Sequence, residues 1–203
     1  MGDKPRHYKF VVTAMFTAII FILTFTPFGF IPLGVINATI IHIPVIIGSI
    51  LLGPKWGAFL GGMFGLGSFI RNTLQPLLTS FVFSFLIPMP GAETGSFRAI
   101  VVCFVPRILV GVVPYFVYRL LCGRKSLQWL ALPVAGVAGS LTNTLLVMHF
   151  IFFLFREAYA NVLGLASAVV YNAILGIIAF NGVPEAVVAG IIVTVLGKVL
   201  LKL

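Results

Sequence analysis

Residues 10–54 read FVVTAMFTAIIFILTFTPFGFIPLGVINATIIHIPVIIGSILLGP and contain no charged side chain. One helical crossing of a bilayer needs roughly 20 apolar residues, so this stretch is long enough for two crossings. Two further uncharged stretches, residues 126–155 and 158–184, are also longer than one crossing requires. The sequence therefore predicts an all-α integral membrane protein that crosses the bilayer several times.

The composition of the whole chain agrees with this prediction. Of its 203 residues, 61% are apolar or aromatic and 8% are charged, and the mean hydropathy is +1.19. Soluble domains carry roughly 25% charged residues, so a third of that share indicates a surface that faces lipid. A chain of 21.9 kDa leaves no room for a sizeable soluble domain as well, which excludes a nucleic-acid reader.

Cutting the apolar stretches at proline, glycine and charge clusters divides the chain into six crossings. They form a compact bundle within a single membrane domain, residues 1–203. The expected crossings are residues 10–27, 38–53, 55–71, 97–122, 130–155 and 173–201. An even number of crossings places both termini on one side. The long connections, residues 28–37, 72–96 and 156–172, are rich in aromatic residues, and we expect them to cover an outward-facing cavity.

Lysine and arginine are distributed unevenly between the two sides of these crossings. If both termini lie inside, nine basic residues are cytoplasmic: Lys4, Arg6, Lys9, Lys55, Arg119, Arg124, Lys125, Lys198 and Lys202. Only Arg71, Arg98 and Arg156 are then external, while Arg107 falls within the fourth crossing. The positive-inside rule therefore predicts cytoplasmic termini. The net charge of +9 then reflects orientation and contact with anionic membrane lipid.

Small residues at four-residue spacing form flat stripes on several of the expected helices. Gly57, Gly61 and Gly65 form such a stripe on the third crossing, where we expect close packing within the protein. Ala14 and Ala18 have the same spacing in the cytoplasmic half of the first crossing. Spacing alone leaves two alternatives for this alanine pair: packing within the chain, or docking of a helix from another protein.

Polar side chains inside a bilayer are costly unless they are satisfied, so each of them is a candidate site residue. In this chain they gather toward the outer leaflet, which favours an outward-facing cavity. The candidates are Asn37, His42, Asn72, Arg98, Arg107, Asn143, His149, Tyr171 and Asn172. For any single residue an interhelical hydrogen bond is the alternative, and Glu185 is an alternative partner for Arg107.

The charged residues of this outer half are mainly arginines. They are Arg71, Arg98, Arg107, Arg156, Glu93, Glu157 and Glu185. If ion pairs form among them, one positive charge remains for a ligand. A guanidinium binds a carboxylate or phosphate through two hydrogen bonds, while Asn and His exchange hydrogen bonds with hydroxyls and amides. The expected ligand is small, anionic and hydroxylated, with Arg98 or Arg107 holding its negative group.

Motifs for energy conversion and catalysis are missing. The GRKS segment at residues 123–126 lacks the upstream glycine of a phosphate-binding loop, so we do not expect the chain to hydrolyse ATP. Ser68 and His149 resemble a catalytic dyad only superficially, because a glycine-rich packing helix explains Ser68 better. No acidic residue lies mid-membrane to carry a coupled proton. We therefore expect no enzyme activity, no metal site and no cofactor.

Three segments make the chain similar to a known family. They are the Ala-x-x-x-Ala of Ala14 and Ala18, the stretch IPLGVINATIIHIPVIIGSILLGPKWGAFLGGMFGL at residues 31–66, and VPRILVG at residues 105–111. With six expected crossings in 203 residues, these segments resemble the substrate-binding S components of energy-coupling factor (ECF) vitamin transporters. The similarity is greatest to the pantothenate-specific members.

The resemblance implies a subunit of the prokaryotic cell membrane that captures pantothenate from outside under loop lids. It further implies that a transmembrane coupling subunit and two ATPase subunits supply the energy. The residues matching Ala14 and Ala18 would dock on the coupling subunit, and the docked protein would topple to deliver the vitamin. Two alternatives stay open: an S component for another vitamin or precursor, and a stand-alone secondary carrier.

Overall fold

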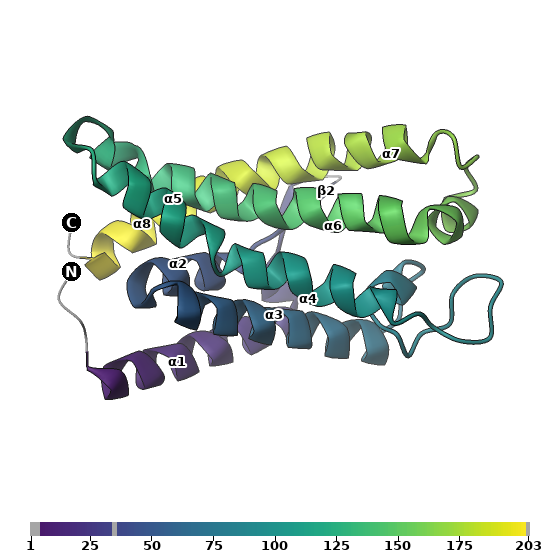
Figure 1. Cartoon of the computed structure of the whole chain (residues 1–203), viewed down its shortest axis with the longest axis horizontal. Coiled ribbons are helices and arrows are strands. Elements are labelled where there is room, and N and C mark those ends of the chain that lie inside the picture. Colours follow the sequence, from purple (N-terminus) through teal and green to yellow (C-terminus); the bar gives the residue numbers. More distant parts are fainter. Residues whose placement is uncertain (1–4, 34–35, 202–203) are drawn as a thin grey trace.

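The computed structural model describes residues 5–33 and 36–201, with the backbone alone for residues 30–33 and 36–38. This part of the chain is nearly all helical, and its α-helices form six helical segments, because α4 continues into α5 and α7 into α8 (Figure 1). The helices are α1 (Arg6–Phe25), α2 (His42–Leu52), α3 (Pro54–Leu74), α4 (Arg98–Val110), α5 (Val113–Cys122), α6 (Ala131–Leu163), α7 (Val170–Ile177) and α8 (Val183–Leu201).

Four helical segments in the described part of the chain are long and apolar enough to cross a membrane. They are Arg6–Phe25, Arg98–Cys122, Lys125–Leu163 and Val170–Leu201. Helix α3 has 21 residues, but its glycines and Arg71 lower its mean hydropathy. Helix α2 has only 11 residues and covers about 16 Å, roughly half of the apolar thickness of a bilayer. Nearly all of α2 is buried, so other helices shield this short segment from lipid.

A short β-hairpin precedes α2, at the point where the sequence predicted the second crossing to begin. Strands β1 (Phe30–Leu33) and β2 (Ile36–Thr39) pair antiparallel, with Phe30 opposite Thr39. Residues 38–41 therefore lie outside the helix. Proline, glycine and β-branched residues dominate this segment and favour extended chain over helix. Pairing between the strands satisfies backbone groups that lipid could not.

Helix α6 continues past residue 155, where the sequence predicted the fifth crossing to end. The backbone is non-helical at Phe155, with φ −135° and ψ 19°, and the helix then resumes to Leu163. It ends at Gly164, whose φ of 65° lies in the left-handed region that glycine favours. Much of the expected loop at residues 156–172 is therefore helical.

The helices form two layers (Figure 1). Helices α1, α2 and α3 lie in one layer and α6, α7 and α8 in the other, with α4 beside α3. The beginning of α1, the end of α8 and the α5–α6 turn lie at one end of the long axis, called here the termini end. The loop of residues 75–97 and the α6–α7 connection lie at the opposite end, called here the loop end.

Glycines bring helix backbones into direct contact between α3 and α4. A Cβ placed on Gly61 would overlap the carbonyl oxygen of Arg107, and one on Gly57 would overlap that of Gly111. The hydroxyl of Ser49 on α2 donates to the same Gly111 carbonyl at 2.6 Å. Close approach of this kind gains dispersion contacts where lipid offers no hydrophobic drive, so the glycine stripe stabilises the bundle from within.

Substitution at two adjacent glycines tests this contact. We expect Gly61→Ala to lower the Tm of the detergent-purified protein by several degrees, because relieving the overlap with Arg107 costs about 1–3 kcal/mol. Gly62→Ala is the matched control, since nothing lies within 4 Å of a Cβ at that position. Thermal unfolding of both variants measures the difference. Equal melting temperatures for the two variants would contradict a tight α3–α4 interface.

Candidate functional site

Several buried polar atoms in the described part of the chain have no hydrogen-bond partner. They include both ring nitrogens of His42, Nε of Arg107, Oδ1 of Asn143 and Oγ of Ser140. His42 is 1% exposed and Arg107 is 6% exposed, so bulk water does not satisfy them. Leaving a buried polar group unpaired costs about 1–3 kcal/mol. These four residues are called here the polar cluster, and their unpaired atoms are candidate contacts for a polar ligand.

Packing of α2 against α6 brings part of the polar cluster together. The two helices run in opposite directions (Figure 1), and a Cβ on Gly139 would lie 2.6 Å from the side chain of Ile46. Four residues make about one helical turn. His42 precedes Ile46 by four residues, and Asn143 follows Gly139 by four. Because the helices are antiparallel, both residues lie one turn further toward the loop end, on the two faces that meet.

Arg107 is a buried cation held by groups that leave its charge uncompensated. Its Nη1 donates to the carbonyl oxygen of Val102 at 2.8 Å. Its guanidinium carbon lies 5.5 Å from the ring centroid of Phe64 and 4.9 Å from that of Phe83. Aromatic faces attract a cation, but they do not neutralise it. A carboxylate that reached the unpartnered Nε would complete the site.

The alternative pair between Arg107 and Glu185 is not formed. The carboxylate of Glu185 instead accepts hydrogen bonds from the backbone N–H of Thr39 at 2.8 Å and from the hydroxyl of Thr144 at 3.5 Å. Among the described residues Arg107 therefore has no acidic partner. A buried cation of this kind is the strongest electrostatic feature of the site.

Aromatic residues of the loop at 75–97 pack against the helices, while the parts of the loop around Leu77 and Gly91 are exposed. The ring of Phe85 stacks between those of Phe69 and Phe97, with centroid distances of 5.3 Å on both sides. Phe81 meets Phe155 edge to face at 5.9 Å. Because Phe83 of the same loop lies against Arg107, the loop covers the buried cation from the loop end.

The remaining predicted residues differ in their surroundings. Arg98 is exposed, and its Nη1 lies 3.5 Å from the carbonyl oxygen of Leu154, while Asn172 is also exposed. His149 bonds through Nδ1 to the carbonyl oxygen of Leu145 at 2.7 Å, and its ring meets that of Tyr171 at 6.3 Å. These residues lie nearer the surface than the polar cluster. The side chain of Asn37 lies outside the described residues.

Asn72 has a hydrogen-bond network of its own. Its Nδ2 donates to the carbonyl oxygen of Ser68 at 2.8 Å, and its Oδ1 accepts from the hydroxyl of Ser80 at 2.8 Å. The same hydroxyl oxygen accepts from the backbone N–H of Leu77 at 2.9 Å. Asn72 therefore ties the beginning of the 75–97 loop to the end of α3.

The sequence prediction missed three residues of the site: Ser140, Phe64 and Phe83. A signal for Ser140 was present, because the segment SLTNT at residues 140–144 concentrates hydroxyl and amide side chains within a helix. No comparable signal marks the two phenylalanines among the 20 in the chain. Their role depends on which rings the fold brings to Arg107.

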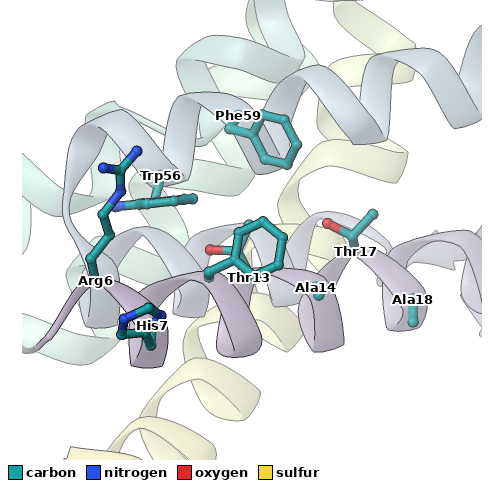
Figure 2. Close-up of a pocket in the computed structure, with 9 residues that line it drawn as sticks. Arg6, His7, Thr13, Ala14, Thr17, Ala18, Trp56 and Phe59 are labelled. Carbon is teal, nitrogen blue, oxygen red and sulfur yellow. The ribbon is translucent and has the colours of Figure 1, made fainter.

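A groove of about 830 Å³ lies between α1 and α3 on the surface of the protein (Figure 2). Ala14 and Ala18 line the groove on the α1 side, and both are exposed. The other lining residues are Arg6, His7, Phe10, Thr13, Thr17, Trp56 and Phe59. Since both alanines are exposed, their small side chains do not serve close packing within the described part of the chain.

The described residues contain no group of three or more His, Cys, Asp or Glu side chains that could hold a metal ion. The site consists instead of a buried cation, aromatic faces and hydrogen-bonding side chains inside a bundle of membrane-crossing helices. This arrangement is typical of membrane proteins that bind a small polar solute.

Comparison with known proteins identifies the family. The chain belongs to the substrate-specific components of ECF transporters, whose family model matches residues 9–197. The resemblance predicted from the sequence is therefore confirmed, and the chain is a multi-pass protein of the cell membrane.

Two relatives are similar over most of their length. The pantothenic acid transporter PanT of Lactococcus lactis subsp. cremoris is 38% identical over 95% of this chain and 88% of its own length. The pantothenate transporter PanT of Leuconostoc mesenteroides subsp. mesenteroides is 30% identical over 100% of this chain and 96% of its own length. Both relatives are named as transporters.

Replacing Asn72 tests its role in holding the loop. We expect Asn72→Ala to increase hydrogen–deuterium exchange in peptides from residues 75–97, because Ser80 loses its acceptor at an expected local cost of about 1 kcal/mol. Gln128→Ala is the control, since Gln128 is an exposed amide residue in the α5–α6 turn at the termini end. Unchanged exchange in the Asn72 variant would show that the aromatic contacts alone hold the loop.

Proposed function

We propose that this chain captures pantothenate from outside the cell as the S component of an ATP-driven ECF importer. The observation that carries the proposal is Arg107, a buried cation with no acidic partner in the described part of the chain. The family and the names of both relatives support the same substrate. An anionic vitamin would supply the charge that the protein lacks.

The chemistry of pantothenate fits the polar cluster. Pantothenate carries a carboxylate at one end, hydroxyls at the other and an amide between them. In this proposal Arg107 holds the carboxylate through its planar donor fork. His42, Asn143 and Ser140 exchange hydrogen bonds with the hydroxyls and the amide. In this proposal the remaining candidates line or support the entrance at the loop end: Arg98, His149, Tyr171, Asn172, Asn72 and Asn37.

Equilibrium binding of radiolabelled pantothenate to the detergent-purified chain tests this assignment. We expect Arg107→Ala to weaken binding by about 100-fold or more, because losing a buried charge-assisted contact costs about 3 kcal/mol. Arg119→Ala is the matched control, since Arg119 is an exposed arginine toward the termini end.

If Arg98→Ala weakens pantothenate binding more than Arg107→Ala does, then Arg98 at the entrance binds the carboxylate instead. If the folded chain binds another radiolabelled vitamin but not pantothenate, the S-component function stands and the substrate changes. Uptake by the purified chain alone in liposomes would instead favour a stand-alone carrier.

Orientation and energy supply form a second part of the proposal. In the proposed orientation the termini end faces the cytoplasm and the loop end faces outward. The basic residues near the termini end support this, including Arg6, Arg124 and Lys198. A coupling membrane subunit with two ATPase subunits drives delivery, and the docked S component topples to release pantothenate inside.

The groove between α1 and α3 is the docking surface for the coupling subunit in this proposal. Ala14 and Ala18 line its α1 side, and their small side chains would let another helix approach closely. Figure 2 shows the aromatic rings of Trp56 and Phe59 on the α3 side of the groove. An apolar partner helix would bury these rings and part of α1.

Filling the groove separates capture from transport. We expect Ala14→Trp and Ala18→Trp to abolish ATP-driven pantothenate uptake with the complete transporter, because the indole occupies the space of the partner helix. Binding of pantothenate to the isolated variants should stay within about twofold of the wild type. Val195→Trp is the control, since Val195 is 58% exposed on α8 and lies outside the groove. Loss of binding together with uptake would indicate that the groove is needed for folding.

A further inference from the structure

Glu185 is the only buried acidic side chain among the described residues, and the proposed site does not use it. It lies in the first turn of α8. Its Oε1 accepts the backbone N–H of Thr39 at 2.8 Å, and its Oε2 lies 3.5 Å from the hydroxyl of Thr144. One carboxylate therefore connects the end of β2 with α6 and α8.

A π-helical turn at Ile178–Gly182 immediately precedes α8. An extra residue in one turn rotates all following side chains by roughly 100° about the helix axis. A Cβ on Gly182 would lie 2.9 Å from Cγ2 of Thr144, so this turn packs directly on α6. The π-helical turn thus sets the rotation at which Glu185 meets both Thr39 and Thr144.

The bond from Thr39 holds the point from which α2 begins. Ile40 and Ile41 connect Thr39 to His42, the first residue of α2. The N–H of Ile40 donates to the carbonyl oxygen of Gly29 at 2.9 Å, and no side chain caps α2. The junction between β2 and α2 is therefore fixed on one side by Gly29 and on the other by Glu185.

We infer that Glu185 is a positioning residue for substrate binding. Its bond to Thr39 holds the beginning of α2, and with it the imidazole of His42, against the wall formed by α6 and α8. The inference rests on the proposed function for the identity of the substrate. Without this bond the β2–α2 junction moves more freely, and His42 spends less time in the geometry that contacts the ligand.

Three substitutions of Glu185 separate reach, hydrogen bonding and charge. Glu185→Ala removes the acceptor, and Glu185→Asp keeps the charge but shortens the side chain by one methylene. Glu185→Gln keeps the length and one acceptor oxygen without the charge. Glu157→Ala is the matched control, because Glu157 is an exposed acidic residue on α6. The readouts are the Kd and dissociation rate of radiolabelled pantothenate, and hydrogen–deuterium exchange of peptides covering residues 39–46 without ligand.

We expect Glu185→Ala and Glu185→Asp to raise the Kd about tenfold, mainly through faster dissociation, and to increase exchange at residues 39–46. Glu185→Gln and Glu157→Ala should stay within about threefold of the wild type. If the alanine variant does not fold, Glu185→Asp and Glu185→Gln are compared by the same Kd and exchange measurements. Weaker binding in the aspartate variant than in the glutamine variant then supports the positioning role.

Unchanged binding in the aspartate and alanine variants, with a wild type that binds, would overturn the positioning role while leaving the proposed function intact. A wild type that does not bind pantothenate would instead contradict the proposed substrate. In that case faster exchange in the alanine and aspartate variants still supports the anchor, and unchanged exchange overturns it.

Discussion

Direct backbone contact between α3 and α4 is the constraint on which the rest of the structure depends. The carbonyl oxygen of Arg107 lies where a side chain on Gly61 would begin, so α4 is fixed in height and rotation against α3. Phe64 follows Gly61 by three residues and supplies one aromatic face for the guanidinium. The glycine stripe therefore does more than stabilise the bundle, because it places a cation where lipid and water are both excluded.

Helix α3 connects two surfaces that serve different purposes in the proposed transport. One face carries the glycines and Phe64 toward α4 and the polar cluster. Another face carries Trp56 and Phe59 toward the groove with α1. Because one rigid helix contributes to both surfaces, a partner that docks on the groove contacts the same element that supports the buried site. In the proposed transport, capture and docking therefore use separate faces of the same helix.

The sequence predicted the helical class correctly, because length and hydropathy determine it. The gathering of polar groups toward the outer leaflet stays a prediction. The sequence could not decide between Arg98 and Arg107, since burial depends on how a helix is rotated against its neighbours, and only the fold places Phe83 over one of them. Likewise, the amide of Asn72 made it a candidate ligand contact. In the structure the hydroxyl of Ser80 donates to its Oδ1, and this contact depends on a loop conformation that the local sequence does not reveal. The β-hairpin depends on similar tertiary support.

The small buried fraction of α1 has a consequence for the resting protein in its membrane. Only 17% of the 18-residue apolar stretch of α1 is buried within the protein. In a bilayer without a partner, acyl chains must therefore occupy the groove above Ala14 and Ala18. In the proposed docking a partner helix would displace this lipid, so the bilayer would act as a competing ligand. The strength of association depends on how well the acyl chains of a given membrane pack against this face, as well as on the two proteins.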